Sequence, residues 1–212
     1  MSEVNLKVIR NFGPSVMKAT IPKSIIENLN NYIDNIIKDK EKSSELNLGE
    51  KLVGDVTQEF KLEKKIMEDS GWLKFLGTCT QRWIELEMNK KISQFFIIDS
   101  WIVRQFENEY NPTHWHGGHV SGAGFLKVPN SLGQHVQKKN EKKYQGGNLQ
   151  LIHGTNMFLC RSILDIVPKV GDFYFFPNYL MHAVFPFKDS KEERRSISFN
   201  AKIDEKIYDV YR

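Results

Sequence analysis

The chain has 212 residues, of which 40% are hydrophobic and 12% aromatic. That length and composition suit one globular core and exclude disordered and fibrous classes. The 30 basic and 26 acidic residues give a formal charge of +4, a balance too even to indicate a nucleic-acid partner, and no apolar run is long enough to span a membrane.

Two amphipathic helices are predicted in the first ninety residues. A strand-like piece, LKVIRNF, precedes the segment IPKSIIENLNNYIDNIIKDK, whose proline suits a helix start. The apolar residues at helical intervals in this segment are Ile25, Leu29, Tyr32 and Ile36. A polar stretch, EKSSELNLGEK, follows. A second, longer helix is predicted from the three- and four-residue steps between Trp72, Phe75, Leu76, Cys79 and Trp83.

From about Ile92 the pattern becomes typical of β-structure. Short runs rich in β-branched and aromatic residues alternate with Gly, Pro and Asn, and no helix-length pattern separates them. The predicted strands are QFFIIDSWIVRQF, SGAGFLKV, GGNLQLIH, MFLCRSILDIV, DFYFFP, HAVFPF and RRSISFNAKI. Strands without crossover helices favour a sandwich or barrel over a parallel sheet, so an α+β fold is predicted.

A polar segment, NSLGQHVQKKNEKKY, interrupts these strands at about residues 130–145. It has no hydrophobic periodicity, and its lysines are Lys138, Lys139, Lys142 and Lys143. A solvated loop is the simplest interpretation. A lid over a substrate is the alternative, because loops between barrel strands often close over a bound molecule.

The two cysteines, Cys79 and Cys160, lack the spacing of a metal or redox motif. We therefore expect buried free thiols in a reducing compartment. The start of the chain, MSEVNLKVIRNFG, has no apolar run of signal length. These features predict a cytoplasmic protein.

Three of the six histidines lie in NPTHWHGGHVSG. Residues two apart in an extended segment point to the same side, so His114 and His116 would present both rings to one face. Two ligands do not hold a metal, and His182, in FFPNYLMHAVFPF, is the candidate for a third. An unpaired imidazole would be costly to bury in that aromatic-rich segment. A pair of hydrogen-bonded histidines on a surface loop is the alternative.

A second feature, RRSISFN, begins twelve residues after His182. Strand alternation places Arg194 and Ser196 on one face and Arg195 on the other. An arginine that faces a buried site needs an anion, and its planar fork matches a carboxylate. Ser196 can donate a further hydrogen bond, so this pattern predicts a site for a small dicarboxylate.

The order of these motifs resembles the 2-oxoglutarate and Fe(II)-dependent oxygenases, and more closely their branch related to prolyl 4-hydroxylases, which includes bacterial and phage proteins of unassigned substrate. The matching stretches are HWHGGHVSGAGFLKVP, GGNLQLI, VPKVGDFYFFPNYLMHAVFPF and RRSISFN, and they cover about half of the chain. The resemblance implies a double-stranded β-helix, or jelly roll, with the N-terminal helices packed against it. It implies one domain over residues 1–212, with residues 1–90 as mainly helical support and 91–205 as the jelly-roll core.

The resemblance also implies a function. Fe(II) would be held by His114, His116 and His182, and 2-oxoglutarate by Arg194 and Ser196, with no catalytic residue beyond the metal ligands. Dioxygen would be consumed to hydroxylate a residue in a peptide or protein, a prolyl residue first by analogy, or else a small molecule. A phage-encoded chain would act in the host cytoplasm.

Two residues depart from the family pattern. His116 stands where the family usually has Asp or Glu, which keeps three facial nitrogen ligands but removes one negative charge. Fe(II) with dianionic 2-oxoglutarate is then about neutral, which remains reasonable in a low-dielectric pocket. Phe125 stands where related enzymes often place a tyrosine whose hydroxyl helps to bind 2-oxoglutarate.

Other interpretations stay open at this point. His119 would replace one ligand if the two glycines before it allowed both rings to share a face, whereas His135 and His153 are expected to be structural or exposed. A cupin-like three-histidine enzyme that does not use 2-oxoglutarate is one alternative function, although it would not need Arg194. A degenerate, non-catalytic jelly-roll binding protein is another.

Overall fold

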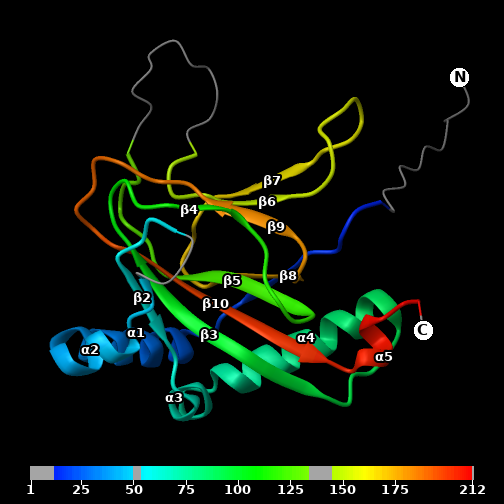
Figure 1. Cartoon of the computed structure of the whole chain (residues 1–212), viewed down its shortest axis with the longest axis horizontal. Helices are drawn as coiled ribbons and strands as arrows, with labels where there is room; N and C mark the ends of the chain where they lie inside the picture. Colours follow the sequence, from blue (N-terminus) through cyan, green and yellow to red (C-terminus); the bar gives the residue numbers. More distant parts are fainter. Residues whose placement is uncertain (1–11, 50–53, 134–144, 212) are drawn as a thin grey trace, which may run out of the picture.

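The computed structural model describes residues 12–49, 54–133 and 145–211, and its strands form two antiparallel sheets (Figure 1). The larger sheet has, in spatial order, β1 (Met17–Thr20), β8 (Asp172–Pro177), β5 (Val120–Lys127), β10 (Arg194–Ile203), β3 (Phe95–Gln105) and β2 (Gln58–Lys61). The smaller sheet has β4 (Asn111–His114), β9 (Met181–Val184), β6 (Leu149–Ile152) and β7 (Ile163–Ile166). The sheets do not close into a barrel, and they confirm the predicted double-stranded β-helix.

Helices cover the face of the larger sheet that is turned away from the smaller one (Figure 1). The helices of the described chain are α1 (Lys23–Lys38), α2 (Lys40–Leu46), α3 (Lys64–Asp69), α4 (Trp72–Met88) and α5 (Glu205–Tyr208). The two long helices pack against the sheet through apolar side chains at helical intervals, as predicted. Side chains buried on α1 are Ile25, Leu29, Ile33 and Ile36, and those on α4 include Trp72, Leu76 and Trp83. They share one apolar core with the outward-facing aromatic residues of the sheet.

Strand alternation separates this helix-side core from the space between the sheets. In β10, Ile197 and Phe199 pack in the helix-side core, whereas Arg194, Ser196 and Ser198 line a cavity on the opposite face. A second apolar cluster lies between the sheets and consists of Phe125, Leu149, Leu151, Ile166, Phe176 and Leu180. The space between the sheets is therefore apolar beside β5 and β8 and polar beside β10 and β3.

Several short elements were not predicted. The helix α2 lies at the predicted polar stretch EKSSELNLGEK, and the strand β2 and the helix α3 lie between that stretch and the second long helix, where no element was predicted. The segment before residue 90 also contributes β1 and β2 to the larger sheet, so it is not helical throughout. The run MFLCRSILDIV forms a strand over Ile163–Ile166 only. The predicted LKVIRNF strand, except for its last residue, and the four loop lysines lie outside the described residues.

Both cysteines are free thiols, as predicted, but their burial differs from the prediction. Cys79 is half-buried on α4, whereas Cys160 is exposed beyond the end of β6. Its exposure follows from its position in the connection between β6 and β7, which extends past the paired strands and leaves Phe158 and Leu159 exposed as well. Across the described ranges, no helix has the length and apolar character needed to cross a membrane.

Candidate active site

Antiparallel pairing brings together histidines that lie far apart in the sequence. His114 is the last residue of β4 and stands directly opposite His182 of β9. His116 lies two residues beyond β4, where its backbone N–H donates to the Asn178 carbonyl at 3.1 Å and its own carbonyl accepts from the Asn178 side-chain amide at 3.2 Å. This short connection therefore holds the third ring beside the other two.

The three rings form a compact group of nitrogen ligands. One ligand atom from each of His114, His116 and His182 lies within 4.8 Å of the others. The Nδ1 atoms of His114 and His182 lie 2.7 Å from the Pro112 carbonyl and 3.0 Å from the Leu180 carbonyl. Because a carbonyl only accepts, these Nδ1 atoms carry the protons and leave both Nε2 lone pairs free. Backbone carbonyls that fix the tautomer in this way are common around metal-bound histidines.

The surroundings of the cluster favour neutral imidazoles. Burial, together with the neighbouring imidazoles, lowers the pKa of His116 to about 3. Burial also lowers the pKa of His182 to about 4, with a contribution from His114, although the hydrogen bond to the Leu180 carbonyl acts in the opposite direction. The Nε2 atoms of His116 and His182 face each other at 3.1 Å. Neutral nitrogen donors that converge in this way fit a transition-metal cation.

Arg194 is a buried cation without a carboxylate partner in the described chain. Its side chain is 2% exposed, and Nη1 donates to Gln105 Oε1 at 2.9 Å and to Ser196 Oγ at 3.4 Å. The guanidinium carbon lies 4.9 Å from the centre of the Phe125 ring, and Nε has no hydrogen-bond partner. Burial lowers the pKa of Arg194 to about 9. An unpaired buried guanidinium fits an anionic ligand, because the anion supplies the charge and the missing acceptors.

Arg195 has the opposite environment, as strand alternation predicted. Its side chain crosses to the helix side of the sheet, where it donates to Asn30 of α1 and forms ion pairs with Asp34 and Glu193. Its charge is therefore already neutralised within the protein. Of the two neighbouring arginines, Arg194 is the one that faces the histidine cluster.

The other described histidines lie apart from the cluster. The Nδ1 atom of His119 accepts a hydrogen bond from the Ile203 backbone N–H at 3.1 Å, and its ring stacks on Tyr208. Because His119 packs against β10 and α5, it does not share a face with His114 and His116. His153 is exposed, and His135 lies outside the described residues.

Two adjacent cavities meet at the histidine cluster. A small cavity of about 40 Å³ is lined by the three histidines, Arg194 and Ser196, among others. A larger one of about 370 Å³ opens on the side of β2. Residues that line both cavities are Trp101, Asn111, His114 and His116. Two of the three imidazoles thus stand on the wall between a small polar recess and a space large enough for another molecule.

The larger cavity contains a residue that the sequence analysis did not identify. Glu59 of β2 lines it, and this side chain is 5% exposed. Its sequence context, QEFK, gives no motif, because the burial arises from the pairing of β2 with β3. Trp101 and Trp115 also line this cavity.

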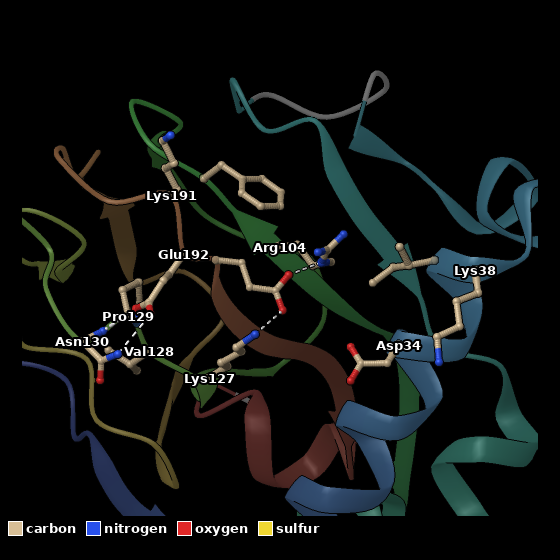
Figure 2. Close-up of a pocket in the computed structure, with 12 residues that line it drawn as sticks. Asp34, Lys38, Arg104, Lys127, Val128, Pro129, Asn130, Lys191 and Glu192 are labelled. Atoms are coloured by element: carbon tan, nitrogen blue, oxygen red, sulfur yellow. Dashed lines mark hydrogen bonds and ion pairs between the residues drawn. The ribbon is translucent and has the colours of Figure 1, made fainter.

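A third cavity, of about 610 Å³, lies elsewhere, on the helix side of the larger sheet. Figure 2 shows Asp34 and Lys38 of α1 facing Arg104 and Lys127 of the sheet across this space. Arg104 and Lys127 both bind the buried carboxylate of Glu193. Because these charges neutralise one another and no histidine lines the cavity, it is separate from the histidine cluster.

Comparisons with known proteins agree with this fold. The family model described as "Putative 2OG-Fe(II) oxygenase" matches residues 99–200. A prolyl-4-hydroxylase from Pseudomonas putida is 14% identical with a TM-score of 0.58, over 90% of this chain and 93% of that one. The viral collagen prolyl hydroxylase of Paramecium Bursaria Chlorella virus-1, solved as a 2-oxoglutarate complex, is 15% identical with a TM-score of 0.55, over 88% and 94%.

A third solved structure with this fold contains a peptide. It is a prolyl hydroxylase from Trichoplax adhaerens in complex with a hypoxia inducible factor peptide fragment, 16% identical with a TM-score of 0.55, over 94% of this chain and 87% of that one. A search of curated proteins by sequence found no match. At these identities the structural neighbours establish the fold, while the chemistry must be argued from the residues of the site.

Proposed function

We propose that this chain, which matches the family model described as "Putative 2OG-Fe(II) oxygenase" over residues 99–200 and shares its fold with a prolyl-4-hydroxylase, is an oxygenase of that family that hydroxylates a carbon of its substrate. The observation that carries this proposal is that three convergent imidazoles and one buried guanidinium without a carboxylate partner border the same cavity. A cupin-like enzyme that does not use 2-oxoglutarate would have no need for that guanidinium.

His114, His116 and His182 would hold the Fe(II) ion. Backbone carbonyls fix the tautomer of His114 and His182 so that Nε2 is unprotonated, and burial lowers the pKa of His116 and His182. With bound Fe(II), 2-oxoglutarate and dioxygen supply the oxidising chemistry, in which decarboxylation of 2-oxoglutarate to succinate and carbon dioxide accompanies conversion of a C–H group to C–OH. Three histidines carry no charge, so the dianion of 2-oxoglutarate balances the charge of the cation.

The protein itself would bind and orient the cosubstrate. Arg194 would hold the far carboxylate through its planar fork, and Ser196 would donate a further hydrogen bond. Phe125 would contribute an aromatic face under the guanidinium in place of the tyrosine hydroxyl found in related enzymes. Because the recess beside Arg194 is about 40 Å³, we expect the lining side chains to move apart when a five-carbon dicarboxylate binds.

The larger cavity would receive the substrate. The structural neighbour solved with a peptide supports a residue of a peptide or protein as one candidate, and a small molecule is the other. The even charge balance gives no support for a nucleic-acid substrate. The helix-side core and the space between the sheets share one sheet, which supports a single oxygenase domain. The exposed free thiol of Cys160 supports a reducing compartment such as the cytoplasm.

The test is formation of succinate from 2-oxoglutarate by the purified chain. The reaction would be run with Fe(II) and dioxygen, first without a substrate and then with a library of peptides and amino acids. We expect slow succinate formation without a substrate and faster formation with an accepted one. If no succinate formed under either condition while the chain bound iron, the oxygenase proposal would be wrong.

A further inference from the structure

The carboxyl group of Glu59 faces the proposed substrate cavity. Glu59 on β2 stands opposite Val103 on β3, and directly opposed residues of antiparallel strands share a face. Val103 lines the small cavity beside the histidines, whereas the next residue along β2, Phe60, is buried in the helix-side core. The alternation of β2 therefore directs Glu59 toward the space between the sheets.

This carboxyl group is buried and has no partner among the residues that the structure describes. The Glu59 side chain is 5% exposed, and no hydrogen bond or ion pair reaches its carboxyl oxygens from any described residue. Burial raises its pKa to about 7. A buried carboxyl without a partner costs free energy in the free protein, and a bound cation or hydrogen-bond donor would offset that cost.

The other charges at this cavity do not satisfy Glu59. The ammonium group of Lys61 is 3.1 Å from a carboxylate oxygen of Asp99 and pairs with it there. Among the described residues, two carboxyl groups and one ammonium group therefore line the cavity, and the acidic groups are in excess. Among the remaining lining residues, His114 and His116 stand at the wall shared with the small cavity, and Trp101 contributes an aromatic face.

We propose that the cavity takes a substrate with a protonated amine or a guanidinium group, which pairs with Glu59 while a nearby carbon lies at the histidine cluster. A lysyl or arginyl residue of a peptide and a free basic amino acid share this chemistry. A prolyl residue within a peptide does not, so the inference departs from the substrates named for the structural neighbours. The hydroxylation step rests on the proposed function, whereas recognition of the cation does not.

Binding can be measured separately from turnover. Isothermal titration calorimetry on the full chain at pH 8, without Fe(II) or 2-oxoglutarate, would compare short peptides that differ only in a central lysine, arginine, norleucine or glutamate. At this pH Glu59 is ionised and a lysyl side chain remains protonated. Free lysine and free norleucine form a second arm that distinguishes a small amine from a residue in a peptide.

The variants Glu59→Gln and Lys61→Gln provide a matched pair. Both change a neighbouring cavity-facing residue of β2 to the same neutral side chain, but they remove charges of opposite sign. We expect the wild type to bind the lysyl or arginyl peptide at least about tenfold more tightly than the norleucyl peptide. Glu59→Gln should abolish this preference, whereas Lys61→Gln should preserve or increase it.

The opposite results would overturn the inference. Equal affinity for lysyl and norleucyl peptides, an equal loss in both variants, or no binding of any cationic probe would each show that Glu59 does not recognise a cation. Succinate formation tests the oxygenase proposal in a separate assay. A chain that binds lysyl peptides through Glu59 but never consumes 2-oxoglutarate would support this inference and contradict the proposed activity.

Discussion

Two histidines of the cluster differ in what their replacement would remove. His182 lies in β9, with Nδ1 held by the Leu180 carbonyl and Nε2 facing His116 at 3.1 Å. His116 follows β4 in a short connection held by Asn178. Alanine at position 182 would therefore remove a ligand atom that the fold holds in place. A carboxylate at position 116, by contrast, would still offer a ligand atom.

We predict that His182→Ala abolishes iron binding and 2-oxoglutarate turnover, because the two proposed ligands that remain, His114 and His116, are too few to hold the ion. His116→Asp should retain at least part of both, because aspartate restores the ligand that is common in the family. Bound iron would be measured by elemental analysis and turnover by succinate formation. Wild-type turnover in His182→Ala would contradict the ligand assignment.

Arg194 can be tested against its neighbour. Lysine at position 194 keeps a positive charge but loses the planar fork and its hydrogen bonds to Gln105 and Ser196. We predict that Arg194→Lys raises the KM for 2-oxoglutarate on the order of 10- to 100-fold, because a charge-assisted bidentate contact contributes roughly 1.5–3 kcal/mol.

Arg195→Lys is the control for this prediction. Its side chain points to the helix side and pairs with Asp34 and Glu193, so the replacement should affect stability and leave the KM for 2-oxoglutarate nearly unchanged. Steady-state kinetics at saturating Fe(II) would measure both variants. Equal KM values in Arg194→Lys and the wild type would show that Arg194 does not bind the cosubstrate.

Local periodicity made some of these residues predictable. The spacing of His114 and His116 and the alternation of RRSISFN both specify a face without any long-range information. Glu59 gave no such signal, because its burial depends on the pairing of β2 with β3, more than forty residues along the chain. His119 also needed the structure, since its partner, the Ile203 backbone, is far away in sequence.

At the level of elements, close packing between β5 and β8 depends on glycine. A Cβ atom at Gly124 would lie 2.3 Å from a ring carbon of Phe173 and 2.6 Å from the Asp172 carbonyl oxygen. Gly77, by contrast, lies inside α4, and a Cβ atom there would lie 3.6 Å from the nearest atom, in the Phe95 ring. The same substitution should therefore have opposite effects at the two positions.

We predict that Gly124→Ala lowers the free energy of unfolding by about 1–3 kcal/mol, because the methyl group forces β5 and β8 apart. Gly77→Ala should raise it by about 0.5–1 kcal/mol, because alanine loses less backbone entropy in a helix. Urea denaturation followed by circular dichroism would measure both. A stabilised Gly124→Ala protein would contradict the packing of these strands.

The long elements and the short ones differed in how well they could be predicted. The helix α4 and the strands β3 and β10 have enough residues to repeat a period several times. The strands β2 and β4 have four residues each and are defined by their partners across the sheet. Their sequences, QEFK and NPTH, contain too few apolar residues to reveal a strand.

Over the whole molecule, the larger sheet separates the part that provides stability from the part that binds. Its outer face packs against the helices, and Arg195 connects β10 to Asp34 of α1. Its inner face has buried ionisable groups that form no ion pair with any described residue, Arg194 at one point and Glu59 at another. Unpaired charges of this kind reduce stability, so the proposed binding groups should affect unfolding in a measurable way.

We predict that Glu59→Gln makes the protein more stable at neutral and alkaline pH. Burial raises the pKa of Glu59 from 4.5 to about 7, so the folded state binds a proton more tightly than the unfolded state does. The wild type therefore loses stability as the pH rises from about 4.5 to 7, and the loss is constant above that range. The difference from Glu59→Gln should be near zero at pH 4 and about 3 kcal/mol at pH 8. Urea denaturation at a series of pH values would measure it, and a variant less stable than the wild type at pH 8 would mean that Glu59 is held by favourable contacts in the free protein.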